Sequence, residues 1–104
     1  MISILDKAKE IIYGDREKTY GTPDKNLKTI AELWSSYIQN IGRNVLTTDD
    51  VCLMMVLLKV ARLANSPEHK DSQIDAAGYM ALMERVQDFN ALTKPNPVPT
   101  GHPE

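Results

Sequence analysis

The sequence predicts an all-α fold, and three observations support this prediction. Apolar residues recur at helical spacing within residues 3–13, 23–40 and 71–92. Residues 51–58 are apolar without interruption, and their methionines and leucines favour a helix over a strand. The chain has no alternating run of β-branched residues and no Asn-Gly hairpin sequence. We therefore expect a four-helix, all-α domain.

The first two predicted helices have recognisable start and stop residues. Ser3 can cap the first helix, and Gly14 can end it because glycine accepts the left-handed conformation. Thr22 is the expected cap of the second helix. Pro23 fits the first position of that helix, where its missing N–H would be unpaired in any case. We expect the second helix to run to about Asn40.

The third predicted helix is almost fully apolar and should be the central element of the fold. Thr47 is its expected cap, and Ser66-Pro67 should end it after Asn65. Asp49 and Asp50 in its first turn fit partners of the helix dipole, with metal ligation as the alternative. A helix that is apolar nearly all round must be covered, either by the other helices or by a second copy of the chain. We expect a homodimeric helical bundle.

Length and composition predict one domain with a tail. A chain of 104 residues forms a single domain, and we assign residues 1–93 to it. Residues 94–104 hold four of the six prolines and are predicted to be a Pro-rich flexible tail. The net charge of −2 supplies no general attraction for a nucleic-acid backbone, so nucleic acid is not an expected partner.

The sequence also predicts a cytoplasmic protein. Its single cysteine, Cys52, lies inside the apolar run and fits a small core residue in a reducing compartment better than a nucleophile. The N-terminus has no basic region followed by a long apolar stretch, so we expect no signal peptide. Eight consecutive apolar residues fall short of the about 20 that a membrane span requires, so no membrane partner is expected.

Charged residues of opposite sign are predicted to meet where the third and fourth helices are joined. Lys59 and Arg62 share one face near the end of the third helix, and Asp71 and Asp75 share one face at the start of the fourth. The link between the helices is short and contains His69, so the two helices should be antiparallel neighbours. Two cations should therefore face two carboxylates at one end of the helix pair.

This charged cluster has two interpretations. It can be a set of salt bridges that fixes the register of the two helices. Alternatively, it can bind a phosphorylated ligand: Arg62 would grip a phosphate, Lys59 would add a point charge, and the carboxylates of Asp71 and Asp75 would hold Mg²⁺. His69 is a weak candidate as a metal ligand, because no second histidine or cysteine stands at ligand spacing.

A second polar group precedes the second predicted helix. Arg16, Tyr20 and Asn26 flank a glycine-bearing connection, and such residues before a helix N-terminus can contact a phosphate or stack on a base. The alternative for this connection is a solvated turn. Trp34 and Tyr37 fit the core, with base stacking as the alternative.

Taken together, these residues resemble a known family. The pattern runs through Arg16…Tyr20-Gly21…Asn26, Ala31-Glu32-Leu33-Trp34, Asp50-Val51…Lys59…Arg62 and His69…Asp71-Ser72…Asp75…Gly78-Tyr79. Over roughly residues 10–85 it resembles a small all-helical domain of unknown function that is common in phages and prophages. The later part also resembles helical nucleotide-modification-associated domains. More distantly, it is similar to the MazG-like nucleoside triphosphate pyrophosphohydrolases, which implies Mg²⁺-dependent release of pyrophosphate by a helical dimer.

The chain departs from the MazG-like pattern in its acidic residues. MazG-like enzymes carry a Glu-Glu-x-x-Glu cluster on one helix and Glu-x-x-Asp on the next. Here Glu32 stands alone on the second predicted helix, and Lys59 and Arg62 occupy the third. Asp71 and Asp75 match the second motif loosely, at a spacing of four rather than three.

The resulting hypothesis is a phage-type helical protein of the host-cell cytoplasm that binds a nucleotide or a similar phosphorylated ligand, with MazG-like hydrolysis as an open extension. The residues assigned to ligand or phosphate binding are Arg16, Tyr20, Asn26, Lys59, Arg62 and His69. Asp71 and Asp75 are assigned to Mg²⁺, and no catalytic residue is assigned. The alternative is a non-enzymatic interaction protein that binds a host factor, in which the charged cluster is purely structural.

Overall fold

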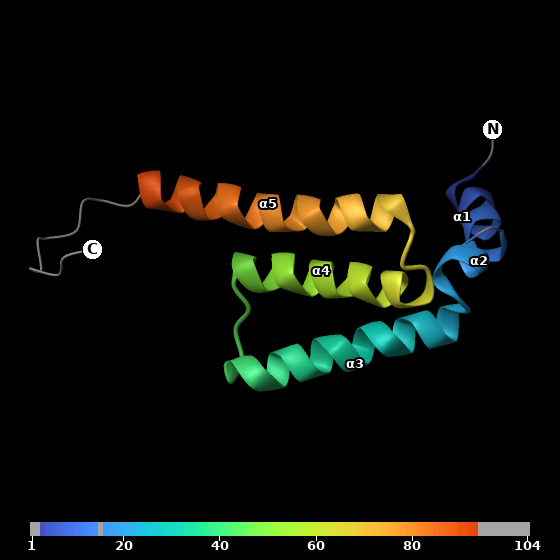
Figure 1. Cartoon of the computed structure of the whole chain (residues 1–104), viewed down its shortest axis with the longest axis horizontal. Coiled ribbons are helices and arrows are strands. Elements are labelled where there is room, and N and C mark those ends of the chain that lie inside the picture. Colours follow the sequence, from blue (N-terminus) through green and yellow to red (C-terminus); the bar gives the residue numbers. More distant parts are fainter. Residues whose placement is uncertain (1–2, 15, 94–104) are drawn as a thin grey trace, which may run out of the picture.

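The computed structural model describes residues 3–14 and 16–93, and every regular element in these residues is an α-helix (Figure 1). The described helices are α1 (Ile4–Tyr13), α2 (Arg16–Tyr20), α3 (Pro23–Ile41), α4 (Thr48–Asn65) and α5 (Lys70–Thr93). The all-α prediction is confirmed. The predicted tail at residues 94–104 lies outside the described residues. No described helix combines the length and apolarity that crossing a membrane would require.

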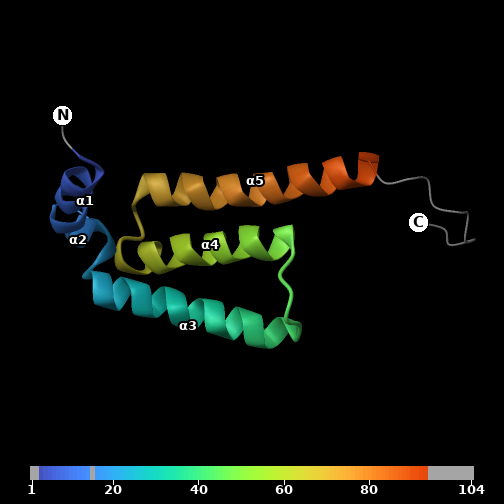
Figure 2. The same cartoon turned by 180° about the vertical axis from the view of Figure 1, so that it is seen from behind.

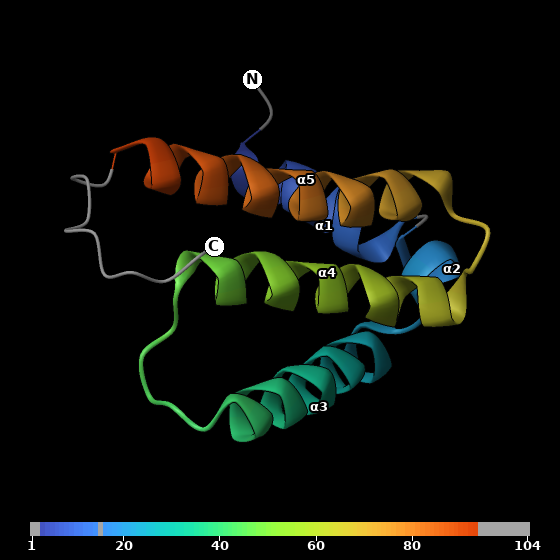
Figure 3. The ribbon, with the colours of Figure 1, turned by 60° about the vertical axis from the view of Figure 1, so that its left-hand side comes forward.

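The three long helices lie in one layer with α4 in the middle. Helix α4 contacts both α3 and α5, whereas α3 and α5 do not contact each other anywhere in the described chain. Views from the front, from behind and after a turn of 60° agree on this order (Figures 1, 2 and 3). The short helix α2 contacts α3 and α4 and lies beside the end of α4, and α1 contacts α2. The two broad faces of this layer, towards and away from the viewer in Figure 1, are therefore not covered by a further long helix of the described chain.

The predicted caps are confirmed at Ser3 and Thr47. Thr22 stands at the cap position of α3, but its side chain makes no capping hydrogen bond, and Gly14 ends α1 with φ of −96° rather than in the expected left-handed conformation. The Ser3 hydroxyl accepts a hydrogen bond from the Asp6 backbone N–H at 3.1 Å. At α4, Thr47 and Asp50 form a capping box, in which each side chain bonds the other residue's backbone N–H. Gly42 follows α3 with φ of 67°, in the left-handed conformation that glycine adopts without strain.

The predicted number of helices was wrong, because the segment expected to be a polar connection contains α2. This helix has five residues, and Gly21 follows it with φ of 81°. Five residues make little more than one turn, which is too short for an apolar period to appear in the sequence.

The core is thin for a chain of this size. Among the described residues the buried apolar ones are Ile30, Met54 and Ala61. Within the apolar run 51–58 only Met54 is buried, so one copy of the chain does not cover the central helix on every side. Trp34 and Tyr37 are half-buried and face α4: the Trp34 indole N–H donates to the Met54 carbonyl at 2.6 Å.

The turn between α3 and α4 is fixed by one buried carboxylate. The Asp50 side chain, 1% exposed, accepts hydrogen bonds from the Arg43 guanidinium, the Tyr37 hydroxyl at 2.6 Å and the Thr47 backbone N–H at 2.7 Å. The Arg43 pair, followed by the Thr47 and Tyr37 hydrogen bonds, holds the pKa of Asp50 far below its usual range. The bond to Asp50 in turn raises the pKa of Tyr37. Asp50 thus stabilises both the N-terminal cap of α4 and the turn between α3 and α4.

Candidate functional site

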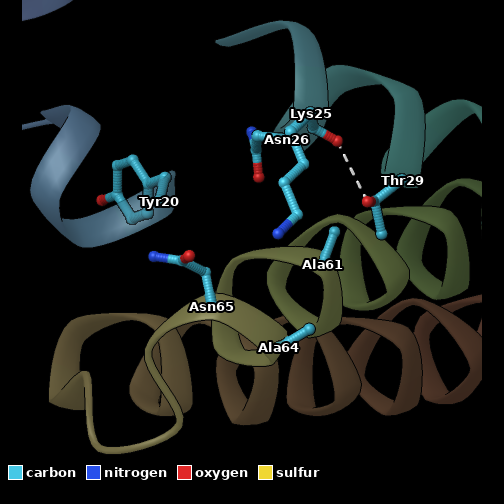
Figure 4. A pocket seen from close by; sticks show the side chains of 7 residues that line it. All are labelled: Tyr20, Lys25, Asn26, Thr29, Ala61, Ala64 and Asn65. Atoms are coloured by element: carbon cyan, nitrogen blue, oxygen red, sulfur yellow. Dashed lines mark hydrogen bonds between the residues drawn. The ribbon is translucent and has the colours of Figure 1, made fainter. Parts of the chain in front are cut away.

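A pocket of about 150 Å³ lies where α2, α3 and α4 meet (Figure 4). Helix α2 contributes the ring of its last residue, the first turns of α3 contribute polar side chains, and the end of α4 contributes two alanines and an asparagine. The lining residues are Tyr20, Lys25, Asn26, Thr29, Ala61, Ala64 and Asn65. The pocket therefore combines an aromatic ring, small apolar groups and several hydrogen-bonding groups.

Asn26 is the polar side chain that distinguishes this pocket. It stands four residues before Ile30 on the face of α3 that packs on α4, in a position where an apolar residue is usual. It is 3% exposed, and neither its Nδ2 nor its Oδ1 atom has a hydrogen-bond partner. Leaving a buried amide unpaired costs about 1–3 kcal/mol per group. A buried polar group that the fold does not satisfy is a candidate ligand contact.

Two further polar side chains point towards the same space as Asn26. Figure 4 shows the Lys25 amino group and the Asn26 amide oxygen directed into the pocket, with the Asn65 amide on its opposite side. Asn65 Nδ2 donates to the Thr19 carbonyl at 2.9 Å, which fixes the end of α4 against α2. A Cβ atom on Gly21 would come within 3.2 Å of Asn65 Oδ1, so glycine suits both the backbone and the space at this position.

Tyr20 joins the pocket to two other predicted residues. The Arg62 guanidinium carbon lies 4.4 Å from the centre of the Tyr20 ring, which is cation–π geometry. The His69 ring meets Tyr20 edge-on, with ring centres 5.5 Å apart. Arg62 Nε is buried and has no hydrogen-bond partner. Ser72, whose backbone N–H donates to His69 Nδ1 at 3.3 Å, orients the histidine. The structure thus brings together Tyr20, Asn26, Arg62 and His69.

The predicted cluster of four charges forms only in part. Lys59 is buried, and its Nζ lies 2.9 Å from Asp75 Oδ2, so this cation and carboxylate meet as expected. Arg62 instead lies over Tyr20, and Asp71 is exposed. Neither makes an ion pair with another described residue. The reason is the direction of the side chains: Lys59 faces α5, whereas Arg62 points towards α2.

The sequence analysis did not predict several of the residues that line the pocket. For one residue that it did predict, the side chain is not described. Lys25, Thr29 and Asn65 line the pocket but were not among the predicted site residues. The side chain of Arg16 lies outside the described part of the chain. Within the described part, no group of three or more His, Cys, Asp and Glu side chains could hold a metal ion by itself.

Comparison with known families assigns the chain to one of them. Residues 3–87 match the profile of a domain of unknown function, DUF6378. The chain belongs to the DUF6378 family. The match includes all the described predicted site residues and the pocket. The resemblance to a small helical phage domain of unknown function is therefore confirmed.

Two curated relatives of this DUF6378 domain come from phages. The Gene 55 protein of Mycobacterium phage L5 is 41% identical over 86 residues, which cover 83% of this chain and 53% of that protein. The Gene 55 protein of Mycobacterium phage D29 is 40% identical over 86 residues, with 83% and 54% covered. The chain thus spans about half the length of the curated relatives it matches. No solved structure matches the chain significantly.

Proposed function

We propose that this DUF6378 domain binds a nucleotide or a similar phosphorylated small molecule in the pocket between α2, α3 and α4. The observation that supports this most directly is the Asn26 amide, which is buried at the pocket with no partner for its donor or its acceptor. Such a group is expensive to retain in a free protein, and it becomes favourable once a ligand pairs with it.

Positive charge beside the pocket supports a phosphorylated ligand. Lys25 is an exposed cation that lines the pocket, and the Arg62 guanidinium lies over the ring of Tyr20, another lining residue. In this proposal Lys25 and Arg62 contact phosphate, Tyr20 stacks on the ligand, and His69 orients Tyr20. Arg16 is proposed as an additional phosphate contact. Lys59 faces Asp75 on α5 and does not line the pocket, so it would contact a phosphate only if this ion pair opened.

We propose that Mg²⁺ binds together with the phosphorylated ligand. Mg²⁺ usually binds proteins through one or two carboxylates and completes its shell with substrate phosphates and water. Asp71 and Asp75 are the proposed carboxylates, and the ion pair between Asp75 and Lys59 makes a preformed site unfavourable. A MazG-like hydrolysis is the enzymatic extension of this proposal, and release of pyrophosphate from a bound nucleotide would support it.

The proposal also includes a homodimer and a cytoplasmic location. Large apolar side chains remain exposed on α1, α4 and α5, and a second copy of the chain would cover them. The second candidate function, a non-enzymatic protein that binds a host factor, draws on the same exposed surface. Nucleotides are abundant in the host cytoplasm, where the single free thiol of Cys52 would also stay reduced.

Replacing Lys25 by glutamine is expected to weaken nucleotide binding by about 10-fold, because a charge-assisted hydrogen bond contributes about 1.5–3 kcal/mol. The measurement is isothermal titration calorimetry with nucleoside mono- and triphosphates, with and without Mg²⁺. Lys28→Gln is the matched control: Lys28 lies one turn further on α3, is highly exposed and pairs with Glu32 rather than lining the pocket.

Two results would contradict this assignment. If no nucleotide binds to the wild-type chain, the proposed function fails and the interaction protein becomes the better candidate. If Lys25→Gln and Lys28→Gln weaken binding equally, the effect comes from the general loss of positive charge, and Lys25 does not contact the phosphate.

A further inference from the structure

We infer that the pocket accepts the base of the nucleotide rather than its phosphates, and that this base has the single ring of a pyrimidine. Asn26 is then the residue that determines which base is accepted, and the sugar and phosphates lie outside the pocket towards Lys25. This inference rests on the proposed function and adds the class of ligand to it.

The first argument is size. The pocket measures about 150 Å³. An apolar cavity of about 150 Å³ in another protein accommodates one benzene molecule, so this volume suits one six-membered ring. A purine adds a fused five-membered ring, and a triphosphate is bulkier still. A single ring is therefore the closer match in size, and a purine or a phosphate chain would have to extend beyond this volume.

The second argument is the chemistry of Asn26. A carboxamide presents one acceptor and two donor hydrogens in a plane, so it pairs with a partner that offers a donor beside an acceptor. The pairing edge of every pyrimidine offers this combination: an amino group beside a ring nitrogen in cytosine, and an N–H beside a carbonyl in uracil or thymine. A phosphate offers only acceptors, which Asn26 Oδ1 would repel. The unpaired Oδ1 therefore favours a base over a phosphate.

The third argument is the surface around the amide. The Tyr20 ring lies on one side of the pocket, and the methyl groups of Ala61 and Ala64 lie on the α4 side (Figure 4). An aromatic ring and small apolar groups suit the faces of a flat ring, because stacking a base on an aromatic side chain contributes about 1–3 kcal/mol. Lys25, next to Asn26 on α3, is exposed at the mouth, where a phosphate would remain partly hydrated.

The test compares ligands that differ in one part. The probes are CMP, UMP, AMP, GMP, ribose 5-phosphate and pyrophosphate, titrated into the full chain by calorimetry. We expect at least one pyrimidine nucleotide to bind about 10-fold or more tightly than either purine nucleotide or the phosphates without a base.

The variants test the role of Asn26 separately. Asn26→Leu should weaken pyrimidine binding by about 10-fold or more and remove the preference over purines. It should not lower the melting temperature of the free protein, because leucine replaces an unpaired buried amide with an apolar group of similar size. Asn40→Leu is the control: it lies on the same helix, is exposed, and hydrogen-bonds only the Ser36 carbonyl at 2.7 Å.

The outcomes separate this inference from the proposed function. If purine and pyrimidine nucleotides bind equally, or if pyrophosphate binds as tightly as CMP and UMP, the inference is wrong while the proposed function stands. If none of the probes binds, both are wrong. A marked fall in the melting temperature of free Asn26→Leu would show that Asn26 supports the fold, and it would overturn the assignment of Asn26 to the base.

Discussion

Replacing Asp50 by asparagine is expected to lower the melting temperature by about 10 °C, because it removes the charge and one acceptor oxygen of a buried carboxylate whose partner, Arg43, is half-exposed. The Asp50 carboxylate is 1% exposed and receives hydrogen bonds from Arg43, Tyr37 and Thr47. Asparagine has one acceptor oxygen where the carboxylate has two, and its NH₂ group would face donors. The substitution would therefore open the turn between α3 and α4 and weaken the half of the capping box that Asp50 supplies, while the bond from the Asp50 backbone N–H to the Thr47 hydroxyl would remain.

The measurement is thermal unfolding followed by circular dichroism at neutral pH. Asp49→Asn is the matched control, because Asp49 also lies in the first turn of α4 but bonds only Gln87, at 3.2 Å. Loss of a dipole partner alone should change the melting temperature by about 4 °C or less. Equal melting temperatures for the two variants would mean that the Asp50 network adds nothing beyond the dipole.

The Asp50 carboxylate should also make the stability of the protein depend on pH. Interaction with Arg43 lowers the pKa of Asp50 in the folded protein, whereas the pKa of the same carboxyl group in the unfolded chain is about 3.9. Its contribution to stability is therefore complete above about pH 5 and falls as the pH drops below that value. The gap in melting temperature between wild type and Asp50→Asn should be constant between pH 5 and pH 7 and should narrow towards about pH 3. A gap that widened in acid would contradict the assigned direction.

Local chemistry explains which parts of the fold could be predicted. Ser3, Thr47 with Asp50, and Gly42 act on neighbouring backbone groups within a few residues, so the sequence predicts helix ends wherever such a cap exists. Helix α2 escaped prediction because its position depends on distant contacts. The Asn65 amide and the Ser66 hydroxyl both donate to the Thr19 carbonyl, across more than 45 residues of chain.

The sequence predicts which kinds of residue belong to the candidate site better than it predicts which of those residues lie together. The spacing of Lys59, Arg62 and Asp75 correctly suggested that oppositely charged side chains of α4 and α5 meet, and one ion pair between these helices does form. A spacing of three residues leaves an angle of about 60° between Lys59 and Arg62 around the helix, enough to send them to different neighbours. Asn26 carried a signal that the sequence analysis did not use: it stands one turn before Ile30, at the start of the face of α3 that is otherwise apolar.

Covering the open layer with a second copy of the chain is expected to make the protein a dimer of twice 11.7 kDa. Helix α5 supplies the clearest surface for it. Ile74, Gly78, Leu82 and Phe89 share one stripe, and three of them are large side chains that remain exposed. A hollow of about 390 Å³ lies along the stripe beside Gly78, where nothing apart from the adjoining part of α5 itself lies within 4 Å of the position a Cβ would take. An apolar stripe with space for an incoming helix is typical of a contact between helices.

Leu82→Glu is expected to weaken this dimer by about 100-fold or more, because an unpaired charge in the centre of an interface costs several kcal/mol. The mass is measured by light scattering after size-exclusion chromatography over a range of concentrations. Ala91→Glu is the matched control: it adds the same charge to an exposed position on α5, about two and a half turns away and thus on the opposite side of the helix. This control should remain a dimer.

The wild-type chain provides a check that does not depend on whether the variant folds. If the exposed side chains are covered only in the dimer, dissociation and unfolding are linked, and the melting temperature must rise with protein concentration. Helix α1 should be stabilised by the second copy in the same way. Its side chains Ile4, Leu5 and Ile11 are largely exposed, and an isolated helix of ten residues is only marginally stable in water. A monomer of 11.7 kDa with a melting temperature independent of concentration would exclude the second copy, and a different partner would then have to cover α5.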